Sequence, residues 1–340
     1  MYIASDIDRQ AHSGIWVLAD AYRGRLKPVA FELLGTARAL AIARPQPVWA
    51  VVFGTELEGT IGPLWEYGAD TVLLLDDPAL ARCADEDAGQ TLLRLIRQYR
   101  PEIVLAGANA TGRALVPRVA VQAHCGLTAD CTELSIDHES GALLQTRPAF
   151  GGNLMATIRS DTCLPQMATV RPGVMRARER QPGRRGELIR ESMLPGERSG
   201  LKTVLETIHD ASASHQLGHA TFVITGGRGM KGPEGFARLA QLAGLVGGSV
   251  GATRAAVDAG WVPYGMQIGQ TGQTVQPKIY ISFGVSGQIQ HLVGMQNSDL
   301  VIAVNRDADA PIMQRADIAI VGDVFEVLEA LIQELTPVSA

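Results

Sequence analysis

The side chains with the clearest capacity to bind a ligand follow an apolar segment that begins at Ile281 and enters a turn at Gly284–Gly287. Behind this turn come two amides and an imidazole, from Gln288, Gln290 and His291. A second apolar run, Leu300–Val304, ends at Asn305. Ligands of open α/β sheets bind beyond the carboxyl ends of the strands, and glycine lets them approach the backbone. The segment therefore predicts a ligand crevice at a strand end.

A second motif, Gly227–Gly232, has the spacing G-x-G-x-x-G between a predicted strand and a predicted helix that has Pro233 at an early position. Backbone N–H groups at such a helix start can bind a diphosphate, and Arg228 can add positive charge. The dinucleotide fingerprint also needs an acid about 20 residues later. In that region no acid precedes Asp258. Two interpretations stay open: phosphate binding, or a glycine-rich turn that lets a helix pack on a strand.

Further glycine-rich loops occur in the same half of the chain, at Gly247–Arg254 and Gln267–Gly272. Each combines glycine with a hydroxyl, an amide or an arginine. One such loop indicates packing. Several of them in one small domain predict a large polar ligand that lies across the strand ends.

The elements that must position these residues follow an alternating pattern. In the first half, strands are predicted at Ile15–Asp20, Val48–Phe53, Thr71–Leu75 and Ile103–Ala106, and helices at Val29–Arg44, Ala88–Tyr99 and Ala114–Ala123. Strand-rich segments follow at Gly141–Arg147, Leu154–Arg159 and Gln166–Val170. In the second half, strands are predicted at Ala220–Thr225, Lys278–Phe283, Leu300–Val304 and Ala316–Val321, and helices at Phe236–Ala243 and Val324–Leu335. Alternation at this pace predicts parallel sheets.

A length of 340 residues suggests two domains. Between the two alternating halves lies a charged, irregular stretch, Arg176–Ser199, with few apolar residues. We therefore expect an α/β protein with two Rossmann-like parallel-sheet domains, the second a compact ligand-binding domain. The expected domains are residues 1–200 and 218–340, with a linker at about 176–217.

Composition excludes several classes of function. A net charge of −5 gives no reason to expect nucleic acid, and no apolar run approaches the roughly 18 residues of a membrane span. The N-terminal segment lacks the apolar region of a signal peptide. The cysteines Cys83, Cys125, Cys131 and Cys163 form no C-x-x-C pair and no metal-ligand spacing. They indicate buried thiols in a reducing cytoplasm and argue against an iron–sulfur cluster. No nucleophile–base pair is recognisable, so no catalytic residue is assigned.

Long segments of the second half closely resemble the α subunit of electron-transfer flavoproteins. The resemblance is carried by Gly251–Pro263, Gln267–Gly272, Gly284–Met295, Ile302–Ile312 and Ala316–Leu331. The first half agrees more loosely, through Gly107–Ala120 and Ala149–Ile158. The resemblance implies a heterodimer of an α and a β subunit. It also implies that the C-terminal domain of this chain binds FAD, with the isoalloxazine ring facing the β subunit.

Carried over residue by residue, the resemblance implies a set of FAD contacts. They are Arg228, Thr253, Arg254, Ile268, Gly269, Gln270, Thr271, Ser286, Gly287, Gln288, Ile289, Gln290, His291, Asn305, Asp323 and Val324. Thr253 stands where several members of the family have serine, and the hydroxyl is kept.

The resemblance places His291 at the C2 carbonyl of the flavin, where a donor would stabilise the reduced ring and raise its potential. The alternative is a core histidine bonded to a backbone carbonyl. Arg254 would place a permanent cation beside the ring. Its alternative is a surface ion pair with Asp258, four residues later.

The remaining implied contacts can also be explained by local structure. Thr271 and Ser286 can bond flavin N5, the C4 carbonyl or the phosphates, or they can serve turn chemistry. Asn305 can bind the adenosine part or form an Asx turn. Asp323, with Glu326 three residues later, resembles a capping box and can also reach an FAD hydroxyl.

We therefore expect the α subunit of a heterodimeric electron-transfer flavoprotein in the cytoplasm of a bacterium or archaeon. It would carry electrons between flavoprotein dehydrogenases, such as acyl-CoA dehydrogenases, and an acceptor, without turning over a substrate of its own. The segments Ala149–Ile158 and Ala168–Met175 leave open an electron-bifurcating variant coupled to NADH and to ferredoxin or flavodoxin. Two functions of a different class compete with this expectation: an NAD-dependent enzyme that uses Gly227–Gly232, and a nucleotide-binding scaffold without redox work.

Overall fold

A computed structural model describes residues 11–22, 24–78, 80, 85–149, 154–160, 162–197, 202, 204–205, 217 and 220–336. The described residues fall into two compact units, the first ending within residues 202–205 and the second beginning at Leu217. The boundaries predicted at residues 200 and 218, and most of the predicted linker after residue 197, lie outside the described residues. These boundaries therefore remain predictions.

The first unit is built on a seven-stranded sheet in the order β12-β5-β4-β1-β6-β11-β7, and every pairing in it is parallel. Its strands are β1 Ile15–Leu18, β4 Val48–Gly54, β5 Thr71–Asp76, β6 Ile103–Gly107, β7 Leu127–Cys131, β11 Gln166–Val170 and β12 Glu187–Arg190. Strands β1, β4, β5 and β6 match the apolar runs in the sequence. The predicted parallel sheet is confirmed in this unit.

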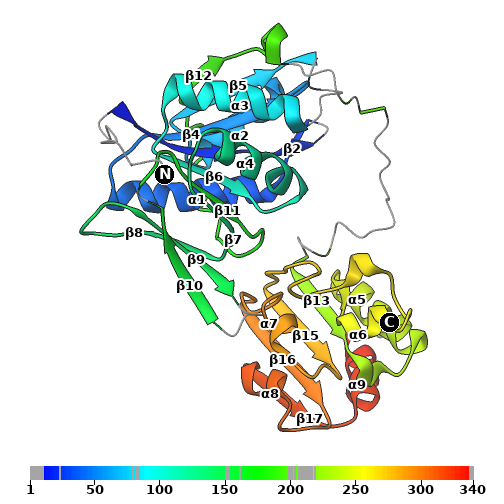
Figure 1. Ribbon diagram of the computed structural model, residues 1–340. Helices are drawn as coiled ribbons and strands as arrows, with labels where there is room; N and C mark the ends of the chain where they lie inside the picture. Colours follow the sequence, from blue (N-terminus) through cyan, green and yellow to red (C-terminus); the bar gives the residue numbers. More distant parts are fainter. Residues whose placement is uncertain are drawn as a thin grey trace. The chain divides into compact units, whose positions relative to one another are not determined.

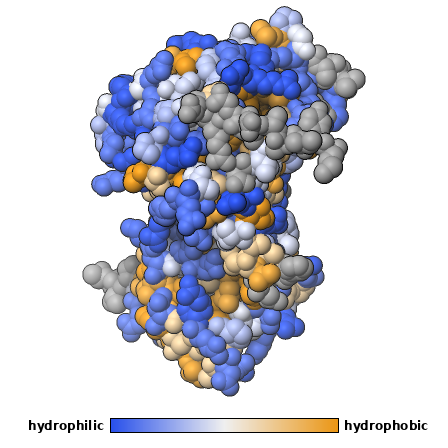
Figure 2. Space-filling view, turned by 60° about the vertical axis from the view of Figure 1, so that its left-hand side comes forward, coloured by the Kyte–Doolittle hydropathy of each residue, from blue (hydrophilic) through white to orange (hydrophobic). Residues whose placement is uncertain are grey.

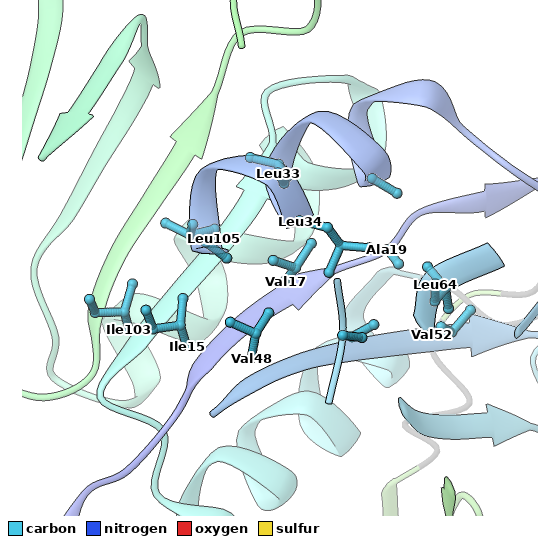
Figure 3. Packing of buried hydrophobic residues seen from close by; sticks show 14 of the residues in the cluster. Ile15, Val17, Ala19, Leu33, Leu34, Val48, Val52, Leu64, Ile103 and Leu105 are labelled. Atoms are coloured by element: carbon cyan, nitrogen blue, oxygen red, sulfur yellow. The ribbon is translucent and has the colours of Figure 1, made fainter. Parts of the chain in front are cut away.

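Helices cover both faces of this sheet (Figure 1). They are α1 Pro28–Ala43, α2 Ile61–Glu66, α3 Asp85–Tyr99 and α4 Ala110–Gln122. Alternate residues of β1 point to opposite faces, so Ile15 and Val17 pack with Leu33 and Leu34 of α1 on one side (Figure 3). Trp16 packs on the other side, in the core that α3 and α4 complete.

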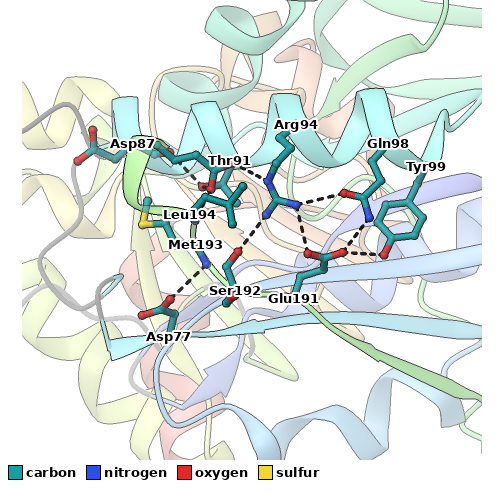
Figure 4. A network of polar contacts seen from close by, with 11 residues as sticks. Asp77, Asp87, Thr91, Arg94, Gln98, Tyr99, Glu191, Ser192, Met193 and Leu194 are labelled. Carbon is teal, nitrogen blue, oxygen red and sulfur yellow. Dashed lines mark hydrogen bonds and ion pairs between the residues drawn. The ribbon is translucent and has the colours of Figure 1, made fainter.

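Short antiparallel sheets complete the first unit. Strands β8 Glu133–Ile136, β9 Leu143–Ala149 and β10 Leu154–Arg159 form a sheet in the order β10-β9-β8, and β2 Ala21–Tyr22 pairs with β3 Arg25–Leu26. The irregular stretch that begins at Arg176 still belongs to the first unit. It contributes β12 at the edge of the large sheet, and a polar network around Arg94 of α3 then holds residues 191–197 against that helix (Figure 4).

The second unit contains a five-stranded, wholly parallel sheet in the order β14-β13-β15-β16-β17. Its strands are β13 Phe222–Gly226, β14 Ser249–Ala252, β15 Ile279–Phe283, β16 Leu300–Asn305 and β17 Ile318–Val321. With two parallel sheets flanked by helices, the predicted α/β class and its pair of Rossmann-like domains are confirmed.

The helices of this unit are α5 Pro233–Val246, α6 Arg254–Asp258, α7 Ile289–Leu292, α8 Pro311–Arg315 and α9 Val324–Leu335. Phe236 and Leu239 of α5 share one core with Leu328 of α9, against one face of the sheet. On the other face, Tyr280 of β15 packs in a core with Ile312 of α8. Pro233 is the first residue of α5, as the sequence predicts, since its missing N–H costs nothing there.

Some local expectations were wrong. Gly247–Arg254 was expected to form a loop, but Ser249–Ala252 is the edge strand β14 and Arg254 opens α6. Helix α4 starts at Ala110 rather than Ala114, because Asn109 caps it by accepting a hydrogen bond from Gly112 N at 3.1 Å. Strands β7 and β12 are short and partly polar, which concealed them in the sequence.

The visible surface of the first unit is mostly hydrophilic and is interrupted by small hydrophobic patches (Figure 2). Among the described residues, no helix is long and apolar enough to cross a membrane. Within the same ranges, no three His, Cys, Asp or Glu side chains are grouped so that they could hold a metal ion. Cys125, Cys131 and Cys163 are free thiols, and Cys83 lies outside the described residues.

Candidate functional site

The candidate site lies where the strand order of the second sheet reverses. Strand β13 is flanked by β14 on one side and by β15 on the other, so the connection from β13 to β14 and the connection from β14 to β15 run in opposite directions along the sheet. In an open parallel sheet this reversal opens a crevice at the carboxyl ends of the strands. Gly227 and Gly284 directly follow β13 and β15, which places both glycine-rich segments at this crevice.

The two glycine segments pack directly against each other. Gly227 N donates to Phe283 O at 2.9 Å, and Gly229 N donates to Gly284 O at 3.1 Å. A Cβ at Gly227 would lie 2.2 Å from Gly284 O, so no side chain fits there. The first two glycines of the G-x-G-x-x-G motif therefore serve close packing between two loops, rather than the packing of a helix on a strand that the sequence offered as the alternative to phosphate binding.

A pocket of about 900 Å³ opens at these strand ends, entirely within the second unit. The expected contacts that line it are Arg228, Thr253, Arg254, Ile268, Gly269, Gln270, Thr271, Ser286, Gln288, Gln290, His291 and Asn305. Gly287, Ile289, Asp323 and Val324 are not among its lining residues. The fold thus gathers most of the expected residues from loops that are far apart in sequence.

Gly287 and Asp323 have evident structural roles instead. A Cβ on Gly287 would lie 2.3 Å from Ile312 N, so this glycine allows α8 to approach the turn after β15. Asp323 caps α9, because its carboxylate accepts a hydrogen bond from Phe325 N at 2.7 Å and pairs with Arg306. These bonds hold the pKa of Asp323 below its usual value. The predicted helix cap at Asp323 is confirmed.

His291 is buried at the pocket, and both of its ring nitrogens have partners in the protein. Nδ1 lies 3.0 Å from Ile268 O, and Nε2 lies 2.8 Å from the Tyr280 hydroxyl. Because a carbonyl only accepts, Nδ1 carries the proton and donates it to Ile268. Burial lowers the pKa of His291 to about 4, and the Ile268 bond opposes this shift, so the ring is neutral at pH 7.

The segment Gln267–Thr271 is held in place by its own backbone and by neighbouring side chains. Ile268 N donates to Ala252 O at 2.9 Å, and Gln270 N donates to Gln290 O at 2.7 Å. The Gln267 amide donates through Nε2 to Thr271 Oγ1 at 2.9 Å. Gly269 adopts φ = +144°, a conformation that side chains rarely allow, so glycine is required at this corner.

At another wall of the pocket, Arg254 pairs with Asp258 through Nε and Oδ2 at 3.2 Å. This is the i,i+4 pair that the sequence offered as the alternative to a ligand contact. Both side chains are more than half exposed, so the pair is weak and an anionic ligand can compete with Asp258 for the guanidinium. Thr253 precedes α6 as its N-cap residue without a side-chain capping bond, which leaves its hydroxyl available.

Asn305 forms the Asx turn that the sequence offered as its alternative role. Its Oδ1 accepts from Asp307 N at 3.1 Å, and its Nδ2 donates to Val285 O at 2.8 Å. The Val285 bond ties the end of β16 to the turn after β15. Asn305 therefore fixes the shape of the pocket, of which it forms part.

Sequence reasoning missed several lining residues. They are Gly227, Gly229, Ala255, Asp258, Gln267, Gly284, Val285, Asp307, Ala310 and Pro311. Gly227, Gly229, Gln267 and Gly284 stood inside segments already singled out, so adjacency to a strand end could have added them. Asp258 was singled out only as a partner of Arg254, and Asp307 carried no signal, because nothing in an isolated sequence distinguishes it from a solvated surface carboxylate.

Comparison with known proteins gives consistent results along the chain. The family model described as "Electron transfer flavoprotein domain" matches residues 15–193. The model described as "Electron transfer flavoprotein FAD-binding domain" matches residues 216–296, which include most of the pocket.

Individual relatives align over almost the full length. The electron transfer flavoprotein subunit alpha of Thermoanaerobacterium thermosaccharolyticum is 46% identical over 95% of this chain and 98% of its own. Protein FixB of Azorhizobium caulinodans is 40% identical over 95% of this chain and 88% of its own. Subunit LctC of the lactate dehydrogenase (NAD(+),ferredoxin) of Acetobacterium woodii is 38% identical over 96% of this chain and 78% of its own.

Proposed function

Because the chain belongs to the electron-transfer flavoprotein α-subunit family, we propose that it binds FAD in the pocket of its second unit and carries electrons together with a β subunit. The flavin would exchange electrons with flavoprotein dehydrogenases, such as acyl-CoA dehydrogenases, and with an acceptor. The chain would hold and tune the cofactor and would transform no substrate of its own.

The observation that carries the proposal is the convergence of the expected FAD contacts on one pocket at the strand-order reversal. These residues come from the segments after β13, β14 and β15 and from the last residue of β16. The pocket volume of about 900 Å³ lies at the upper end of the range for ligand sites, as a dinucleotide requires. Residues scattered over unrelated surface loops would not enclose such a volume together.

The chemistry of the lining fits a flavin dinucleotide. Arg228 and Arg254 supply positive charge for phosphates or for a ring that becomes anionic, while Thr253, Thr271 and Ser286 supply hydroxyls. The amides of Gln270, Gln288 and Gln290 add donors and acceptors. When bound, the flavin supplies the redox chemistry that these side chains lack.

His291 would then act as a neutral imidazole at the ring. Its nitrogens are bonded to Ile268 and Tyr280, so in this geometry the neutral ring has no N–H left to donate to the flavin carbonyl. Ile268 and Gly269 would place backbone close to the ring. Gly287, Ile289, Asp323 and Val324 would support the site from behind it or contact parts of FAD that extend beyond the pocket.

The direct test is to co-express the chain with a β subunit, purify the complex and record its visible spectrum before and after reduction with dithionite. A flavin spectrum that bleaches on reduction, with FAD released on denaturation, is the expected result. A colourless complex would contradict the proposal and favour a scaffold without redox work. NADH binding by this chain alone would favour the NAD-dependent interpretation of Gly227–Gly232.

A second candidate is an electron-bifurcating complex, which the name of one relative favours. LctC of A. woodii is a subunit of a lactate dehydrogenase that uses NAD(+) and ferredoxin, and it aligns with 96% of this chain. A bifurcating complex would hold a second FAD, mainly in the β subunit, and NADH would reduce it directly. Counting FAD per heterodimer and adding NADH anaerobically separates this candidate from a simple carrier.

A further inference from the structure

The hydrogen bond between Gln267 and Thr271 fixes the polarity of a hydroxyl at the pocket wall. Gln267 is only 3% exposed, and its Nε2 donates to Thr271 Oγ1 at 2.9 Å. Thr271 itself is exposed, and both residues line the pocket. A buried amide thus donates a hydrogen bond to a hydroxyl that a ligand in the pocket can reach.

This bond determines which hydrogen-bonding role the Thr271 hydroxyl can take toward a ligand. A threonine hydroxyl has one hydrogen to donate and two lone pairs with which to accept. The amide N–H of Gln267 uses a lone pair and leaves the hydroxyl hydrogen unused. The hydrogen is therefore available to an acceptor in the pocket.

The backbone of each of the two residues is held in place by further bonds. The Thr271 carbonyl accepts a hydrogen bond from the Tyr264 hydroxyl. The Gln267 carbonyl accepts from Gln273 N at 2.7 Å, and Gln267 forms a parallel bridge with Ala252 at the end of β14. The direction of the Thr271 hydroxyl is thus set by the fold before a ligand arrives, which reduces the cost of ordering it on binding.

We propose that Gln267 is a positioning residue that holds the Thr271 hydroxyl as a hydrogen-bond donor, so that this wall of the pocket selects a ring nitrogen or carbonyl oxygen of the bound cofactor. The inference rests on the proposed function, because it takes the cofactor to be FAD. It assigns to the buried amide of Gln267 control over whether Thr271 donates or accepts in its contact with the cofactor.

The test uses a substitution at Gln267 that reverses the direction of its hydrogen bond with Thr271 and keeps the side chain nearly the same shape. In Gln267→Glu, assayed at a pH high enough to ionise the buried carboxyl, the carboxylate only accepts, so it draws the Thr271 hydrogen toward itself and removes the donor from the pocket. Gln267→Met removes the amide without adding charge. Each change is made with Thr271 intact and in a Thr271→Val background, and FAD affinity of the cofactor-free heterodimer is measured by flavin fluorescence quenching.

We expect Gln267→Glu to weaken FAD binding about three- to tenfold more with Thr271 intact than in the Thr271→Val background, the value of one hydrogen bond. The effect of the new charge is present in both backgrounds and cancels in this comparison. Thr271→Ser, which keeps the hydroxyl, restores the difference. Gln267→Met should also weaken FAD binding more with Thr271 intact, but by a smaller factor. Folding of each variant is checked by thermal melting of the cofactor-free heterodimer. If the glutamate variant does not fold, the methionine variant decides the test.

Equal effects of Gln267→Glu in both backgrounds would overturn the inference, because Gln267 would then act without Thr271. Unchanged FAD binding by Gln267→Glu would overturn it as well, since it would mean that Thr271 already donates to residue 267. If the wild-type heterodimer takes up no FAD, the proposed function fails together with this inference. If the wild-type heterodimer takes up FAD normally but Gln267→Glu has the same effect in both Thr271 backgrounds, only this inference is contradicted and the proposed function stands.

Discussion

The Tyr280 hydroxyl lies 2.8 Å from Nε2 of His291, and both side chains are buried in the second unit. Since Nδ1 donates to Ile268 O, the neutral ring can only accept at Nε2, and Tyr280 must donate to it. The imidazole is thereby fixed as one tautomer by two protein partners. The structure thus shows the alternative of a core histidine bonded to a backbone carbonyl, and it leaves the neutral ring no N–H for the flavin carbonyl that the tuning role requires.

Replacing Tyr280 with phenylalanine should destabilise the second unit by about 1–3 kcal/mol, because Nε2 would remain buried without a donor. Hydrogen exchange of the β15 and α7 amides, followed by mass spectrometry, locates the effect. Ser282→Ala is the matched control, since it also removes a buried hydroxyl from β15 but one whose bond to Ile302 O is long, at 3.4 Å. An equal loss of protection in both variants would contradict the special role of Tyr280.

The low pKa of His291 predicts that the second unit loses stability in mild acid. The folded-state pKa is about 4, below the ordinary value of 6.5, so unfolding takes up a proton between these values. Stability attributable to His291 is therefore complete above about pH 6.5 and falls as the pH drops toward 4. At roughly 1.4 kcal/mol per pKa unit, the loss is on the order of 3 kcal/mol.

This pH dependence is measured by urea unfolding of the wild type and of His291→Gln between pH 7 and about pH 4.5, a window inside the titration range of the buried imidazole. The glutamine variant should be less stable at pH 7 but should lose less stability on acidification. Parallel curves for the two proteins would show that His291 titrates normally in the folded state. His12→Gln, in the first unit, controls for removal of a histidine as such.

The Arg254–Asp258 pair predicts that a carboxylate at the pocket wall weakens the binding of an anionic cofactor. Asp258→Asn frees the guanidinium and should tighten FAD binding about two- to fivefold, in line with the small energy of an exposed pair. Arg254→Ala should weaken binding. Glu329→Gln breaks the Arg238–Glu329 pair on α5 and α9, away from the pocket, and should leave FAD affinity unchanged. FAD affinity that does not change in Asp258→Asn would contradict competition for Arg254.

The sequence predicted most of the sheet because its apolar runs are continuous. Strands β4 and β5 are buried on both faces, so their residues are apolar almost without exception. Strand β14 was missed because Ser249, Gly251 and Ala252 give no strand pattern, and pairing with β13 alone makes them a strand. Strand β12 was missed for a similar reason, since only two of its residues are half-buried.

The site was predictable in part, because its residues follow strands whose ends must meet. Which atoms face the pocket was not predictable. The bonds of His291 to Tyr280 and Ile268 join residues 11 and 23 positions apart, and only the packed structure brings them together. Gln267 was missed for the same reason, since its role depends on the direction of its amide toward Thr271.

Arg94 predicts a large effect of a single change on the first unit. Its guanidinium donates to Glu197 Oε1 at 2.6 Å, to Glu191 Oε2 at 3.2 Å and to Ser192 O at 2.9 Å (Figure 4). Arg94→Ala removes these bonds together and leaves two carboxylates without their cation. We expect a loss of about 2–3 kcal/mol, and weaker hydrogen-exchange protection of residues 191–197.

Arg97→Ala is the control for this prediction, because Arg97 lies one turn along the same helix and its side chain is exposed. Its bond to Gln122 O is long, at 3.4 Å, so its removal should change stability by less than about 0.5 kcal/mol. Tryptophan fluorescence during urea unfolding follows the first unit through Trp16, Trp49 and Trp65, after Trp261 of the second unit has been replaced by phenylalanine in all proteins compared. Equal unfolding midpoints for the two variants would show that Arg94 does not hold the segment after β12 to α3, and that the apolar core alone keeps it in place.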